Sequence, residues 1–92
     1  MINWKPLLDK GVILMNNISH LSDISEGETA VVSELLNSGG IRRRLQDIGL
    51  IKGTPVSCFL RGTAGDISAF LIRGAVIALR REDSERVIVR KC

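Results

Sequence analysis

The stretch 41–54 constrains the fold of this chain more than any other, because it signals a helix, its end, a turn and a new strand. Ile41, Leu45 and Ile48 recur at the spacing that places side chains on one face of a helix. Gly49 follows where many helices end in a left-handed residue, and the leucine after it is placed to contact Leu45, as in a Schellman motif. The sequence therefore predicts a short helix with a fixed end, for which Leu45 and Gly49 are structural residues.

The residues that flank this helix favour a loop before it and a turn after it. Residues 37–40 break the preceding segment, and Ser38 is the expected N-cap of the helix. Lys52 and Gly53 suit the centre of a type II turn, in which the glycine takes a positive φ. Pro55 is tolerated as the first residue of a strand. The helix is therefore expected to lie between two strands, and Gly53 is a third structural residue.

Several segments have the alternation or the β-branched residues that are typical of short strands. They are 28–35, 55–60, 67–72, 75–80 and 87–89. Alternation predicts which side chains share a face: Ala30 with Val32; Val56 with Cys58 and Leu60; Ile67 with Ala69 and Leu71; and Phe70 with Ile72. Arg73 and Gly74 separate two of these segments closely enough for a hairpin.

Apolar residues occupy both faces of the segments 67–72 and 75–80. We therefore expect these strands to be covered on both sides, as in a small closed barrel. The predicted fold is mainly β, an SH3-like barrel of about five strands with one short helix inserted after the first strand.

Charge is divided unevenly along the chain. Residues 1–40 contain two basic and five acidic residues, whereas residues 41–92 contain eleven basic and five acidic ones. A basic half of this kind suits nucleic acid, an acidic protein surface or anionic lipid headgroups, and it does not choose among them.

Three consecutive arginines, 42–44, lie in the first turns of the predicted helix, where the helix dipole disfavours positive charge. Arg43 is four residues before Asp47, but with the cation first, which is the weaker order for such a pair. We therefore expect these arginines to contribute little to stability. They form either a solvated helix face or a partner-binding surface, and both interpretations stay open.

The run 42–56, RRRLQDIGLIKGTPV, resembles the pattern RRRL.dlGl.pGt.V of the FeoA family, the small cytosolic component of bacterial ferrous iron transport. Further stretches resemble the family in the same order: 21–28, Gly65-Asp66, 72–74 and 77–83. Lys52 and Ile67 stand where family members often have proline. The resemblance covers about residues 20 to 90, and it implies the same SH3-like fold.

The resemblance also implies a function. A FeoA-like domain at residues 20–92 would be a non-enzymatic accessory or regulatory module of ferrous iron uptake, acting with a FeoB-type membrane transporter on its cytosolic side. It would bind no nucleotide. We expect the basic surface to contact the partner through five arginines: Arg42, Arg43, Arg44, Arg80 and Arg81.

The sequence offers little for catalysis or metal binding. His20 is the only histidine, so neither a histidine relay nor a histidine pair for a metal exists. Cys58 and Cys92 are expected to be two reduced thiols. The FeoA family is associated with transition metal ions, and the weak candidates for such a contact are His20 with Asp23 or Glu26. We therefore predict no enzyme and no resident cofactor.

Residues 1–19 are expected to form an N-terminal extension, in which Trp4 docks on the barrel, with a disordered extension or a contact with a partner as the alternatives. Residues 1–14 should be dispensable for folding, because the resemblance begins near residue 20, and either Met1 or Met15 is a suitable start. No apolar run approaches the roughly 20 residues of a membrane span. We expect the protein in the cytoplasm, held at the inner face of the membrane only through its partner.

Two alternatives to a transport module remain. The basic half favours a nucleic-acid-binding small barrel. Proteins of this kind stack bases on aromatic side chains, however, and this chain has only two phenylalanines and one tryptophan. The accessory barrel of an iron-dependent repressor normally follows a DNA-binding helix-turn-helix, for which 92 residues leave little room.

Overall fold

The computed structural model describes residues 17–92, and within them the chain forms six strands and three helical segments. The strands are β1 Ile18–His20, β2 Thr29–Leu35, β3 Pro55–Arg61, β4 Ile67–Ile72, β5 Ala75–Arg80 and β6 Val87–Lys91. The helical segments are the 3₁₀ turn η1 Leu21–Asp23, the helix α2 Gly39–Asp47 and the single turn α3 Arg81–Ser84. Among the described residues, no helix has the length and apolar character needed to cross a membrane.

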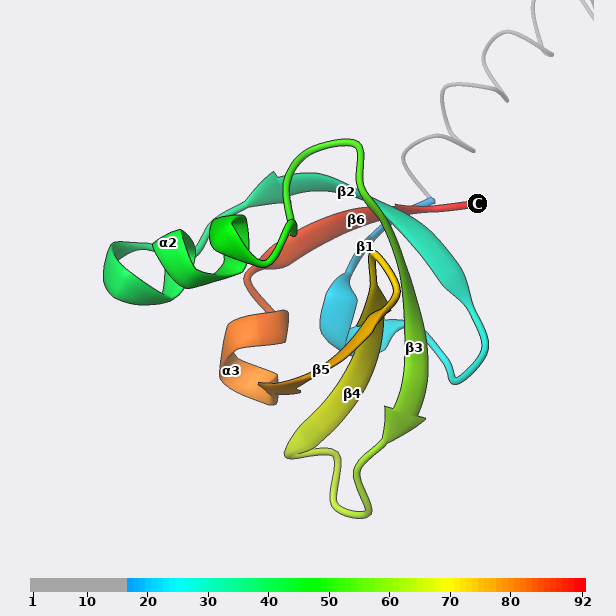
Figure 1. Cartoon of the computed structure of the whole chain (residues 1–92). Coiled ribbons are helices and arrows are strands. Elements are labelled where there is room, and N and C mark those ends of the chain that lie inside the picture. Colours follow the sequence, from blue (N-terminus) through cyan, green and yellow to red (C-terminus); the bar gives the residue numbers. More distant parts are fainter. Residues whose placement is uncertain (1–16) are drawn as a thin grey trace, which may run out of the picture.

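The strands form one curled antiparallel sheet in the order β1-β6-β2-β3-β4-β5 (Figure 1). The predicted mainly-β, SH3-like fold is confirmed. The sheet differs from a closed barrel, because its edge strands β1 and β5 do not pair with each other. It also has six strands, and α2 follows the second of them, because the three-residue β1 is too short to show an alternating pattern. We expected the domain to start at residue 20, but Ile18 and Ser19 already belong to the sheet, because β1 pairs with β6.

The core lies inside the curl of the sheet and is closed at one end by α2. Side chains from the inner faces of the strands are buried there, together with Leu45 of α2 and Leu50 after it. The predicted pairs Ala30 with Val32, Val56 with Cys58, and Phe70 with Ile72 all point into this core.

Two β-bulges change the faces that simple alternation assigns. In β2 the register shifts between Val32 and Glu34, which lets Leu35 turn into the core. In β3 the register shifts between Cys58 and Leu60, so that Leu60 is 56% exposed rather than buried beside Cys58 as predicted. An extra residue in one strand reverses the direction of every side chain that follows it.

Within residues 17–92, β4 and β5 are covered on one side only and not on both sides as expected. Ile67, Leu71 and Val76 are exposed, and so are Phe59 and Leu60 of β3. We call these five residues the outer apolar face. No element within residues 17–92 lies over this side of the sheet.

The end of α2 has the predicted Schellman geometry. The Leu50 N–H donates to the Leu45 carbonyl at 2.9 Å, and the Gly49 N–H donates to the Gln46 carbonyl at 3.0 Å. Gly49 has a φ of 98°, and a side chain there would also meet the aliphatic part of Arg73. Ser38 occupies the N-cap position with extended backbone, but its hydroxyl makes no capping hydrogen bond.

Both predicted turns are present. Gly53 has a φ of 91°, and the Thr54 N–H donates to the Ile51 carbonyl at 3.0 Å, which closes the turn that leads into β3. Arg73 and Gly74 have φ values of 50° and 83° and join β4 to β5 as a two-residue hairpin.

Candidate partner-binding groove

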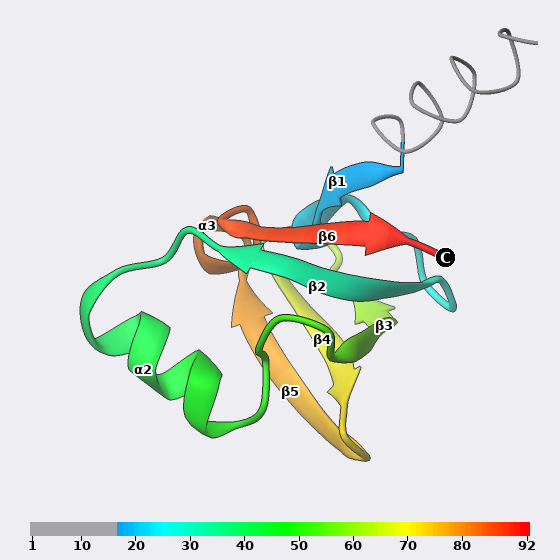
Figure 2. The same ribbon diagram turned by 90° about the horizontal axis from the view of Figure 1, so that it is seen from above.

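A groove of about 390 Å³ separates α2 from the edge strand β5. Seen from above, α2 lies next to β5 (Figure 2). The groove is lined by residues of three elements: Ile41, Arg44, Leu45 and Ile48 of α2, Ile77, Ala78, Leu79 and Arg80 of β5, and Asp83 of α3. Leu45 and Leu79 are buried, and Ile41, Ile48 and Ile77 are half-buried against the core. The groove therefore has an apolar floor and is open to solvent.

The groove brings two of the five predicted arginines together. Arg44 from α2 and Arg80 from β5 are exposed and line it on opposite sides, with Asp83 as the one acidic residue. A shallower hollow of about 410 Å³ lies next to it and shares Arg80. Because α2 and β5 are far apart in the sequence, only the fold makes Arg44 and Arg80 neighbours of one site.

Arg42 has a structural role that differs from our expectation for the three arginines. Its Nη1 donates to the Leu35 carbonyl at 2.5 Å and to the Asn37 carbonyl at 3.3 Å. The half-buried guanidinium thus ties the start of α2 to the end of β2. Arg43, by contrast, is exposed. No spacing rule would have identified this role, because it depends on the path of the loop between β2 and α2.

Replacing Arg42 by alanine should lower the free energy of unfolding by about 1–3 kcal/mol, because the two carbonyls lose a charged donor. Arg43→Ala is the matched control, since it removes the same side chain from an exposed position one residue away. Urea unfolding of both variants and the parent measures the difference. Equal midpoints for the two variants would mean that the Arg42 hydrogen bonds do not stabilise the protein.

Arg81 points to a different part of the surface. Its Nε lies 3.2 Å from a carboxylate oxygen of Glu85, four residues further on, and both side chains are about half exposed. An ion pair of this kind contributes little to stability. Arg81 lines the neighbouring hollow and not the groove, so it is separated from Arg44.

The weak metal candidates are only partly brought together. His20 and Asp23 line a small hollow of about 360 Å³ with Glu85 and Arg81. The His20 Nδ1 lies 2.7 Å from the Glu85 carbonyl oxygen and donates to it, so this nitrogen is not free to bind a metal. Glu26 lies outside this hollow and accepts a hydrogen bond from the Arg61 N–H at 2.8 Å. Within residues 17–92, no three His, Cys, Asp or Glu side chains are grouped closely enough to hold a metal ion.

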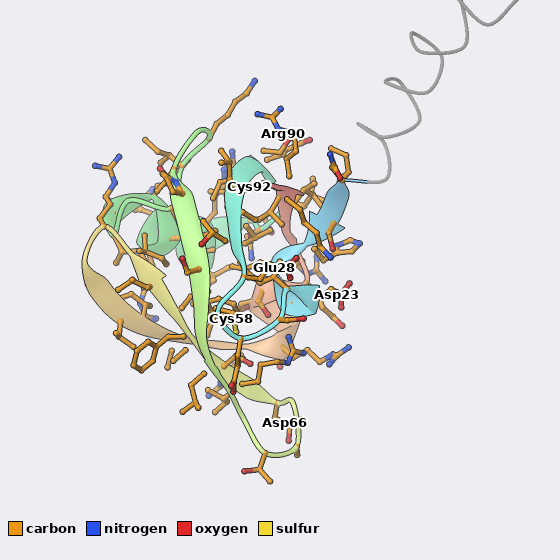
Figure 3. All side chains as sticks on the ribbon, turned by 90° about the vertical axis from the view of Figure 1, so that its right-hand side faces the viewer. Asp23, Glu28, Cys58, Asp66, Arg90 and Cys92 are labelled. Atoms are coloured by element: carbon orange, nitrogen blue, oxygen red, sulfur yellow. The ribbon has the colours of Figure 1, made fainter. Side chains whose placement is uncertain are left out.

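The two cysteines occupy different environments (Figure 3). Cys58 is buried in the core, and this burial raises the pKa of its thiol. Cys92 is exposed at the end of the chain. Because the thiolate is the reactive form, a raised pKa and burial both make Cys58 unreactive near neutral pH.

A disulfide reagent such as 5,5′-dithiobis(2-nitrobenzoate) should therefore modify Cys92 rapidly at pH 8, while Cys58 reacts only when the protein unfolds. The absorbance of the released thiol, followed in buffer and in denaturant, gives the number of reactive cysteines. Rapid modification of Cys58 in the native protein, identified with a Cys92→Ser variant, would contradict its placement in the core.

A family model described as "FeoA domain" matches residues 19–91. The chain belongs to the FeoA family. The match includes the run 42–56 and the later stretches on which the resemblance rests, so the predicted family is confirmed. The family is associated with ferrous iron transport.

Solved structures agree with this assignment. The FeoA protein from Chlorobium tepidum is 28% identical, with a TM-score of 0.75 over 78% of this chain and 69% of that one. Stenotrophomonas maltophilia FeoA, solved with zinc and described as a prokaryotic SH3 domain protein, is 28% identical, with a TM-score of 0.68 over 76% of this chain and 87% of that one.

One further neighbour shares only the fold. A manganese-dependent transcriptional repressor superimposes with a TM-score of 0.74 at 16% identity, over 82% of this chain and 41% of the repressor. No curated protein sequence matches the chain.

Proposed function

We propose that this FeoA domain is a non-enzymatic accessory or regulatory module of ferrous iron uptake, which docks on the cytosolic part of a FeoB-type membrane transporter. The observation that carries the proposal is the groove between α2 and β5, with its apolar floor and with Arg44 and Arg80 beside it. In this account the protein works in the cytoplasm and reaches the inner face of the membrane through its partner.

The chemistry of the groove suits a protein segment with apolar and acidic side chains. Affinity would come from apolar side chains that enter the floor between Ile41, Ile48 and Ile77, since buried apolar anchors dominate most interfaces. Arg44 and Arg80 would attract an acidic rim on the partner and set its orientation. No aromatic residue lines the groove, so it differs from the grooves that bind polyproline helices.

The same account assigns no catalytic step and no resident cofactor to the domain. The only histidine uses Nδ1 to bind a backbone carbonyl, and no described cluster of side chains is arranged to hold a metal. A weak contact between a divalent ion and His20 with Asp23 is the remaining metal candidate. The guanidinium of Arg81 in the same hollow disfavours a cation there.

Calorimetric titration of the transporter's cytosolic part tests the proposal. The double variant Arg44→Ala/Arg80→Ala should bind about tenfold more weakly than the parent, a difference of about 1.4 kcal/mol. The loss should be larger at low salt, because exposed charges act over longer distances there. Arg90→Ala, which removes an exposed arginine from β6, is the control and should bind like the parent.

Equal affinities and equal salt dependence for parent and double variant would exclude the groove arginines from the interface. Circular dichroism of the variants shows whether the fold is retained, and we expect no change, because Arg44 and Arg80 are exposed.

A further inference from the structure

The outer apolar face contains five of the eight large apolar residues that are exposed among residues 17–92. Phe59, Leu60, Ile67, Leu71 and Val76 are between 39% and 61% exposed. The strand register brings them to one side of the sheet: Leu71 lies opposite Val76, and Leu60 lies opposite Ala69, which is flanked by Ile67 and Leu71 on the same side of β4. Contiguous apolar patches on a small domain mark surfaces that something covers, whereas single exposed residues need no explanation.

This face is distinct from the groove between α2 and β5. None of the five residues of the outer apolar face lines the groove, although Ala78 and Arg80, which alternate to the same side of β5 as Val76, lie at its rim. A partner in the groove would therefore leave at least Phe59, Leu60 and Leu71 on β3 and β4 exposed.

The chain itself contains a segment with matching chemistry. Nine of residues 1–15 are apolar: Met1, Ile2, Trp4, Leu7, Leu8, Val12, Ile13, Leu14 and Met15. They lie outside the described residues. A segment of this length is too short to build a core of its own and gains most by burying its apolar residues against an existing surface.

We propose that residues 2–8 cover the outer apolar face, with Trp4 as the anchor against Leu71 and Val76. A tryptophan buries about 150–250 Å² and is the largest apolar group in this chain. Covering the face in this way removes a surface through which the open sheet would otherwise associate with other molecules.

The length of the segment allows this contact. The described chain begins at Asn17, whose carbonyl accepts a hydrogen bond from the Lys91 N–H at 2.8 Å, so the segment starts from the edge formed by β1 and β6. Thirteen residues of extended chain from Asn17 to Trp4 span about 43–47 Å. A domain of this size is roughly 30 Å across, so Trp4 can reach the β4–β5 surface around the sheet.

Trp4 is also the natural probe for the proposal, because the protein has no other tryptophan and no tyrosine. In the full-length protein its fluorescence emission should lie at shorter wavelength than that of N-acetyltryptophanamide in the same buffer. The double variant Leu71→Asp/Val76→Asp should shift the emission to the wavelength of the free amide. The matched control is Leu36→Asp/Ile51→Asp, which changes residues of similar exposure, 50% and 42%, away from the face, and it should emit like the parent.

A second variant leaves the outer apolar face intact. Its result therefore does not depend on whether the sheet still folds with two aspartates in β4 and β5. Full-length Trp4→Ser should bind the apolar dye 8-anilinonaphthalene-1-sulfonate more strongly than the parent, because the outer apolar face becomes accessible. Far-UV circular dichroism should be the same for both proteins.

Three results would overturn the proposal. The first is parent emission at the wavelength of the free amide. The second is a short-wavelength emission that the face variant does not change while its circular dichroism stays native, since Trp4 would then dock elsewhere. The third is an emission that shifts to longer wavelength when sedimentation shows that dilution has produced monomers, since a second copy would then cover the face.

Discussion

Replacing Leu45 by alanine is expected to lower the free energy of unfolding by about 2–5 kcal/mol, the range for removing a fully buried leucine side chain. Leu45 is 1% exposed and is the one fully buried side chain of α2. Its carbonyl also accepts the hydrogen bond from Leu50 that ends the helix. The substitution therefore loosens the contact that holds α2 against the sheet and leaves a cavity beneath the groove.

Gln46→Ala is the control for this prediction, because it changes an exposed residue of the same helix. Urea unfolding followed by circular dichroism compares the two variants with the parent, and the control should lie within about 0.5 kcal/mol of the parent. An unchanged midpoint for Leu45→Ala would show that α2 does not pack on the core.

Replacing Phe70 by alanine should have the largest effect of any single truncation, about 3–5 kcal/mol. Phe70 is fully buried and lies opposite Cys58 on β3 and Ile77 on β5, at the centre of the inner face. It is the largest fully buried side chain of the described residues, so its removal leaves the largest cavity.

The chain provides a matched control in Phe59, which undergoes the same substitution on the neighbouring strand but is 61% exposed. Phe59→Ala should cost less than about 1 kcal/mol. Thermal unfolding of Phe70→Ala, Phe59→Ala and the parent measures how much stability each variant loses. Equal losses of stability would mean that the inner and outer faces of β3 and β4 are assigned incorrectly.

The helix and its end could be predicted from the sequence because their signals are local. The spacing of Ile41, Leu45 and Ile48 and the glycine that follows depend only on neighbouring residues, and so does the turn at Gly53. The faces of β3 could be predicted only as far as Cys58. The bulge beyond it depends on the pairing with β4, which leaves no signature in the alternation of β3.

The openness of the sheet was not predictable for a similar reason. Apolar residues on both faces of a strand are typical of a strand that is covered on both sides, but Leu71 and Val76 are exposed within residues 17–92. Whether a sheet closes at its edges or is covered on its outer face depends on how the whole chain packs, and no local pattern signals it.

The sequence predicted that arginines form the candidate site, but not which of them lie together. Charge counting identified the basic half, but only the packing of α2 beside β5 places Arg44 and Arg80 at one groove. Arg42 instead binds the loop between β2 and α2, and Arg81 forms a local pair with Glu85 four residues further on. The arginines thus have different roles that depend on where the fold places each of them.

The central claim is that this FeoA domain acts on a ferrous iron transporter through the groove, and affinity capture from iron-limited cells tests it most directly. The full-length protein carries the tag, and the retained material is examined for protein and for RNA. We predict that the parent retains a membrane transporter with a GTP-binding domain, and that Arg44→Ala/Arg80→Ala retains much less of it while Arg90→Ala retains as much as the parent. Retention of RNA without the transporter, or equal retention of the transporter by all three proteins, would contradict the account.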